Sequence, residues 1–176
     1  MSETISFKYV PLADSIIKEI DYDEVLGLFS KLETCIFIIG EKGEAYTENV
    51  MDFVNKLAKK HNITNVYLFD PTFINVYGEK ENMIDCKSLE IKLKYYKLVE
   101  LLKFKNQELC KDTLIPKIHT PFISSIRFGS MIEYIEAPYD RKDGKLFSNN
   151  EDITISFVDE LSHVISDVKL DYKLIF

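Results

Sequence analysis

Two short apolar runs flank an amphipathic segment in residues 34–69, which are TCIFIIGEKGEAYTENVMDFVNKLAKKHNITNVYLF. The runs at 34–39 and 66–69 are rich in β-branched and aromatic residues, as is typical of strands buried on both faces. The segment at about 44–61 repeats apolar residues at helical spacing and is polar elsewhere. The order strand, helix, strand predicts two parallel strands joined by a right-handed crossover.

Further elements are predicted on the N-terminal side of this unit. Residues 4–10 alternate loosely and predict an edge strand. A helix is predicted from Asp21 to Leu32, because Asp21 suits the cap position and Glu24 follows three residues later. The sequence therefore favours an additional strand and helix before the buried run.

The C-terminal side predicts a helix, a hairpin and a second helix. Residues 88–104 start with a strand-like alternation but continue at helical spacing, which favours a helix. Residues 122–128 and 131–136 predict the two strands of a hairpin that turns at Gly129-Ser130. A closing helix is predicted from about 155 to 168.

Length and charge exclude several classes of protein. The chain has 176 residues, of which 46% are hydrophobic and 29% are charged, so we expect a single globular α/β domain over 1–176 with an insert at about 70–116. It has 22 basic and 29 acidic residues and a net charge of -7. This balance argues against nucleic acid and anionic membranes as partners, since both attract clustered positive charge.

Membrane insertion and secretion are not expected. No apolar run approaches the roughly 18 residues of a membrane span. The start, Met1 to Thr4, lacks a basic region followed by an apolar stretch, so we expect no signal peptide and a cytoplasmic location.

The cysteines predict neither a disulfide scaffold nor a metal site. There are three, at Cys35, Cys86 and Cys110, and no pair has the spacing of zinc ligands. Cys35 opens an apolar run, which favours an inert buried thiol. We therefore expect no metal and no cofactor.

The whole pattern resembles a known family. The order β–α–β–α–β–α–β–β–α and the segment Ile118-His119-Thr120-Pro121-Phe122 are similar to the thioredoxin-like superfamily, particularly to bacterial thioredoxin-like and bacteriocin-transport-accessory-type proteins. The resemblance covers roughly residues 15–170. It implies a three-layer α/β/α sandwich with a central mixed sheet and an inserted helical segment before the hairpin. It also implies a cis peptide bond between Thr120 and Pro121.

The redox motif of that family is missing. The resemblance places the motif, often Cys-Pro-Tyr-Cys, on Glu44-Ala45-Tyr46-Thr47, where the tyrosine matches and both cysteines are absent. Dithiol chemistry needs a reactive thiolate at a helix N-terminus and a second thiol one turn later. Glu44 and Thr47 supply neither, so we expect no catalytic residue here.

We therefore expect a non-catalytic binding or accessory module whose partner is a peptide or a protein. In the family, the residue before the proline pairs through its backbone with an extended substrate segment, a role that falls on Thr120. The candidate binding residues are Glu44, Ala45, Tyr46, Thr47, His119, Thr120 and Pro121.

Other interpretations stay open from the sequence. The carboxylate of Glu44 could simply stabilise the helix dipole, by about 0.3–1 kcal/mol. An enzyme could use the thiol of Cys86 or Cys110, or could bind glutathione at Thr120-Pro121 in the manner of a transferase. A purely structural role, including a homodimer, is the third alternative.

Overall fold

The computed structural model of the chain describes residues 15–43, 45–71, 87–103, 109–110, 114–136, 159 and 161–168. A further helix, at 161–168, follows the last strand. The predicted order of elements is confirmed from the first predicted helix, at 21–32, to the closing helix. The other elements, in chain order, are β1 (Ile17–Glu19), α1 (Tyr22–Ser30), β2 (Cys35–Ile39), α2 (Ala45–Lys60), β3 (Val66–Phe69), α3 (Leu89–Leu102), β4 (Phe122–Arg127) and β5 (Ser130–Glu136).

The five strands form one mixed sheet in the order β1-β3-β2-β4-β5. Strand β3 pairs in parallel with both β1 and β2, so the predicted parallel βαβ unit is confirmed. Strand β4 runs antiparallel to β2, and β5 returns antiparallel to β4 as the predicted hairpin. Strands β1, β3 and β2 thus form the parallel half of the sheet, and the hairpin is added next to β2.

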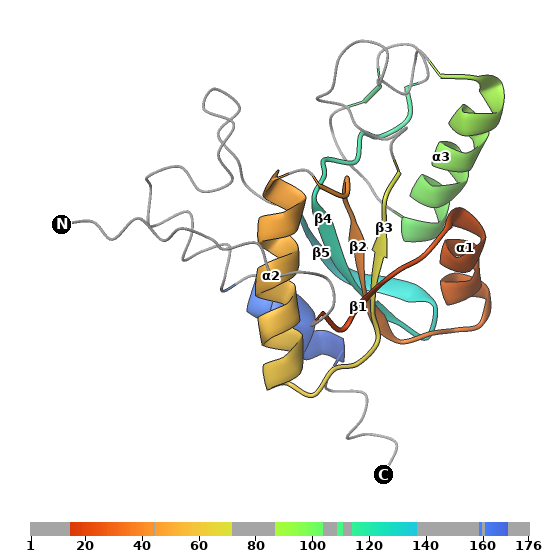
Figure 1. The fold of residues 1–176 in the computed structure, drawn as a ribbon. Coiled ribbons are helices and arrows are strands. Elements are labelled where there is room, and N and C mark those ends of the chain that lie inside the picture. Colours follow the sequence, from red (N-terminus) through yellow and green to blue (C-terminus); the bar gives the residue numbers. More distant parts are fainter. Residues whose placement is uncertain are drawn as a thin grey trace.

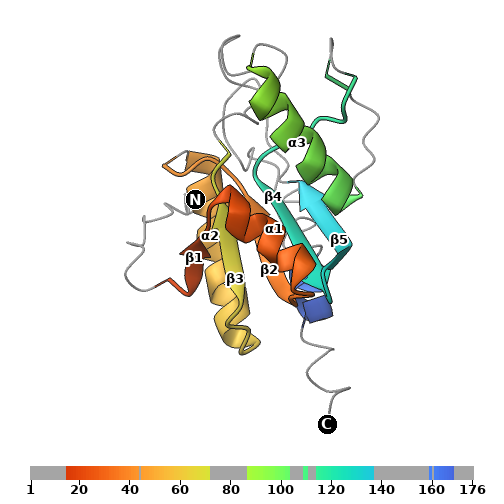
Figure 2. The same ribbon diagram turned by 90° about the vertical axis from the view of Figure 1, so that its right-hand side faces the viewer.

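Helices cover both faces of the sheet. Figures 1 and 2 show α2 and the helix at 161–168 on one face, and α1 and α3 on the other. Strand β2 lies in the middle and is buried throughout. Its Ile36 and Ile38 side chains belong to the core beneath α2 and the helix at 161–168, whereas Cys35, Phe37 and Ile39 belong to the core beneath α1 and α3. Because alternate side chains of a strand point to opposite faces, a two-sided core requires this unbroken apolar run. The architecture is an α/β sandwich with a mixed sheet.

Local signals in the sequence explain where the helices begin and end. Asp21 and Glu24 form a reciprocal capping box at the start of α1, as predicted. Helix α2 ends before Asn62, which adopts a left-handed φ of 57°. The side chain of Ser88 caps α3, which confirms a helix rather than a strand in this segment. Among the helices that are described, none has the length and apolar character needed to cross a membrane.

Two predictions about the strands need revision. The turn of the hairpin is formed by Phe128 and Gly129, not by Gly129-Ser130, because Ser130 already pairs with Arg127. Both turn residues have positive φ values, 49° and 70°, as a two-residue hairpin turn of type I′ requires. β1 was not predicted at 17–19, and the edge strand predicted at 4–10 lies outside the described residues.

Candidate functional site

The candidate site lies where β2 ends and β4 begins. The last pair of these strands joins Ile39 to Phe122, so the next residues, Gly40 and Pro121, come opposite each other. The peptide bond between Thr120 and Pro121 is cis, as the resemblance implied. Pro121 is buried and Thr120 is half-buried. We call the place formed by Gly40, Thr47, Thr120 and Pro121 the cis-proline corner.

Helix α2 reaches the cis-proline corner through Thr47. This side chain is fully buried in the first turn of the helix. A Cβ atom on Gly40 would lie 2.6 Å from Thr47 Cγ2, so the two residues are packed directly against each other. The start of α2 and the start of β4 therefore meet at the end of β2. Of the other predicted residues in this loop, Glu44 and the side chains of Ala45 and Tyr46 lie outside the described residues.

The backbone before Pro121 is hydrogen-bonded as far as His119, whereas the backbone of Thr120 has no such bond among the described residues. The N–H of His119 donates a hydrogen bond to Glu136 Oε1 at 3.1 Å, which ties the segment to β5. Within the described part of the chain, no hydrogen bond involves the backbone of Thr120. Because unpaired backbone groups need water or another partner, a half-buried Thr120 offers a donor and an acceptor to an incoming chain.

A tyrosine that the sequence did not single out fixes this approach. The hydroxyl of Tyr95, in α3, donates a hydrogen bond to the Pro116 carbonyl at 2.5 Å and accepts one from the Ile118 N–H at 2.9 Å. Burial raises the pKa of Tyr95, with nearby Cys110 contributing, so the hydroxyl keeps its proton. A tyrosine on the apolar face of a helix was the available signal, since a buried phenol needs a polar partner.

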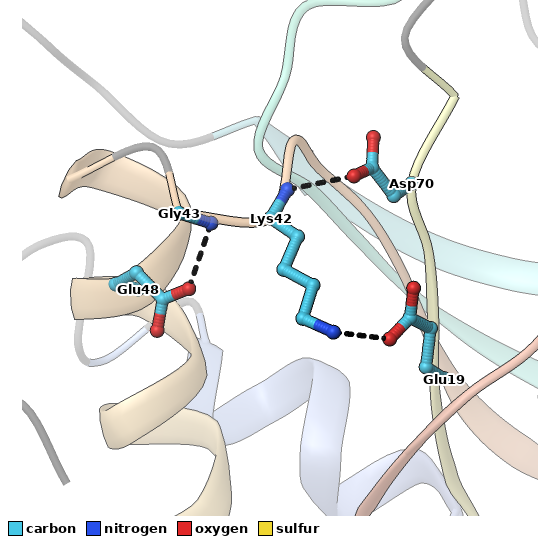
Figure 3. A network of polar contacts seen from close by, with 5 residues as sticks. All are labelled: Glu19, Lys42, Gly43, Glu48 and Asp70. Atoms are coloured by element: carbon cyan, nitrogen blue, oxygen red, sulfur yellow. Dashed lines mark hydrogen bonds and ion pairs between the residues drawn. The ribbon is translucent and has the colours of Figure 1, made fainter. Parts of the chain in front are cut away.

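The loop between β2 and α2 is anchored by a polar network, shown in Figure 3. The Lys42 N–H donates to Asp70 Oδ2 at 3.1 Å, and its ammonium contacts Glu19 Oε2 at 2.8 Å. The Gly43 N–H donates to Glu48 Oε1 at 2.9 Å. The network joins the carboxyl ends of β1, β2 and β3. The Lys42–Glu19 pair is half-exposed, so it orients the loop more than it stabilises the fold.

The described thiols lack the features of reactive cysteines. Neither Cys35 nor Cys110 is in a disulfide, and their exposed fractions are 0% and 1%. Burial raises the pKa of Cys35 to about 12, and the Glu33 carboxylate adds to the increase. A thiol of this kind carries almost no thiolate at neutral pH. Cys86, the other thiol considered for an enzyme, lies outside the described residues.

The site has no metal-binding cluster in the part of the chain that the structure describes: no group of three or more histidine, cysteine or acidic side chains is placed to hold an ion. Comparison of the chain with models of known protein families and with curated proteins gives no match in either case.

Proposed function

We propose that this chain is a thioredoxin-like domain without dithiol chemistry, and that it binds an extended segment of a peptide or protein at the cis-proline corner. One observation carries the proposal: the backbone of Thr120 makes no hydrogen bond within the described residues, next to a cis proline at the start of β4. An open backbone at such a place is suited to strand-like pairing with another chain.

The arrangement of the sheet supports the thioredoxin-like part of the proposal. A parallel βαβ unit is followed by α3, by an antiparallel hairpin and by a helix at 161–168. This is the order on which the resemblance was based. The contact between Gly40 and Thr47 supports it further, because it brings the position of the missing redox motif to the corner.

Binding at this corner is non-covalent. The N–H and C=O of Thr120 pair with the backbone of the extended segment, and these hydrogen bonds supply affinity with little dependence on sequence. Neighbouring side chains then select among segments by shape and charge. The resemblance places the two thiols of the redox motif at Glu44 and Thr47, and neither a carboxylate nor a hydroxyl can form a disulfide with the bound chain.

A titration followed by amide-resolved NMR tests the binding. The probe is reduced, carboxymethylated lactalbumin, an unfolded chain without free thiols. We expect shifts at the amides of Gly40, Thr120 and Phe122, with Thr120→Ala binding as the wild type does. Thr120→Pro, which removes the N–H, should weaken binding. Shifts confined to residues away from these three would contradict the proposal.

An insulin-reduction assay with dithiothreitol tests the absence of dithiol chemistry. The expected rate equals the background rate without the protein, because Cys35 and Cys110 are buried. A rate clearly above background would overturn the redox-inactive part of the proposal and would turn attention to Cys86.

A further inference from the structure

Helix α3 holds the segment that leads into the cis-proline corner. Tyr95 is fully buried, and its hydroxyl bridges the carbonyl of Pro116 and the N–H of Ile118. These two positions lie four and two residues before Thr120 in the chain. A single hydroxyl thus sets two backbone groups on the path to the corner.

Two further hydrogen bonds and a bridge lie within this segment. The Cys110 N–H donates to the Ile115 carbonyl at 2.8 Å, and the Leu114 N–H donates to the Cys110 carbonyl at 3.0 Å. An isolated bridge joins Leu109 to Pro116. These bonds within the segment do not fix where it lies relative to the sheet. The His119 bond to Glu136 ties its end to β5, and the bonds of Tyr95 connect Pro116 and Ile118 to a helix that packs on the sheet.

Helix α3 is itself anchored. Leu98 and Leu102 are fully buried in the core beneath it. On the side of α1, the Tyr22 hydroxyl donates to the Lys94 carbonyl at 3.2 Å. Tyr22 and Tyr95 thus make the same kind of bond, from a phenol to a main-chain carbonyl. Tyr22 leaves the segment before the corner untouched, so it provides a matched control.

We propose that the Tyr95 hydroxyl is a positioning group that sets the backbone of Thr120 for pairing with an extended chain. The inference rests on the proposed function of the corner. Removing the hydroxyl leaves the Pro116 carbonyl and the Ile118 N–H without their partner, and the segment then samples positions in which Thr120 is displaced. The apolar ring keeps its place in the core, so the fold is retained.

Amide hydrogen exchange and binding in Tyr95→Phe and Tyr22→Phe test this inference. We expect the Ile118 amide to exchange about tenfold faster in Tyr95→Phe, as the loss of one buried hydrogen bond implies. The affinity for reduced, carboxymethylated lactalbumin should fall by a similar factor. Tyr22→Phe should change neither quantity. A merely structural role of Tyr95 would instead speed the exchange of amides throughout the sheet.

The outcomes separate the two proposals. If the wild type does not bind lactalbumin at the corner, the proposed function fails, while the exchange rates still decide whether Tyr95 holds the segment. The positioning role is overturned if Ile118 exchange is unchanged in Tyr95→Phe. It is also overturned if Ile118 exchange rises while the wild-type affinity is kept.

Discussion

Gly40 and Thr47 are packed so closely that position 40 has no room for a side chain: a Cβ there would lie 2.6 Å from Thr47 Cγ2 and 2.8 Å from Oγ1. Thr47 is fully buried, so its side chain is packed among other groups. We predict that Gly40→Ala lowers the free energy of unfolding by about 1–3 kcal/mol, as overpacking of a core typically does. Urea denaturation measures this change.

The matched control for this prediction is Thr47→Ala, which removes both crowded atoms. In that background Gly40→Ala should cost less than about 1 kcal/mol, so the two changes are coupled. If the two losses in free energy of unfolding are simply additive, the strain at position 40 has another source, and the direct packing of Gly40 against Thr47 is contradicted.

The turn of the hairpin carries a large apolar residue in an unfavourable conformation. Phe128 has a φ of 49° and an exposed fraction of 56%. Asparagine tolerates this backbone region far better, and Asn-Gly is the preferred pair in a type I′ turn. We predict that Phe128→Asn raises the free energy of unfolding by about 0.5–1 kcal/mol. Thermal and urea denaturation check this prediction.

Gly129→Ala provides the opposite case in the same turn. Gly129 has a φ of 70°, and an added Cβ would lie 2.4 Å from the Phe29 carbonyl oxygen. This variant should be clearly less stable than the wild type. A loss of stability in Phe128→Asn as well would mean that the Phe128 ring contributes contacts that outweigh its backbone strain.

Stability should fall in alkaline solution because of Cys35. Burial raises its pKa from 9.0 to about 12, so between these values the unfolded thiol is ionised and the folded one is not. The unfolded state then binds fewer protons, and the free energy of unfolding decreases as pH rises through this window. Below pH 9.0 the contribution is fully present. Urea denaturation at one pH below 9.0 and one within the window measures the decrease.

The control for the alkaline decrease is Cys35→Ala, which should show a smaller loss of stability over the same window. Some loss should persist, because burial also raises the pKa values of Tyr95, Tyr22 and Tyr134 above 10.0. An identical decrease in the variant and the wild type would contradict the assignment to Cys35.

The capping box of α1 gives a prediction about its N-terminus. The Glu24 N–H donates to Asp21 Oδ1 at 2.9 Å, and the Asp21 N–H donates to Glu24 Oε2 at 2.8 Å. Asp21→Ala should lower the free energy of unfolding by about 1 kcal/mol, and Asp21→Ser should recover most of the loss. Equal stability of the two variants would show that the cap contributes little.

Part of the fold could be predicted because it depends on residues that are close together in the sequence. Strand β3 has the predicted bounds, 66–69, and α2 differs from its prediction by about one residue at each end. The cap of α1 was also visible in the sequence. Apolar runs, helical periodicity and capping residues act within a few positions of one another, so a single sequence reveals them.

Other parts depend on residues that are distant in the sequence. Strand β1 has three residues, too few for a recognisable alternation, and it is defined by pairing Ile17 with Val66. The turn was misplaced by one residue because contacts outside the hairpin set it: the Gly129 N–H bonds to the Glu33 carbonyl, and the Phe128 N–H bonds to Thr34 Oγ1.

The same division applies to the candidate site. The Thr120-Pro121 dipeptide could be chosen through the resemblance to a known family, because it stands directly before a predicted hairpin. The contact of Gly40 with Thr47 and the two bonds of Tyr95 became visible only in three dimensions. Periodicity records which face of an element is buried, but it does not record which distant group meets a given side chain. That pairing is decided when the sheet and helices pack, and at this corner it determines how Thr120 is presented.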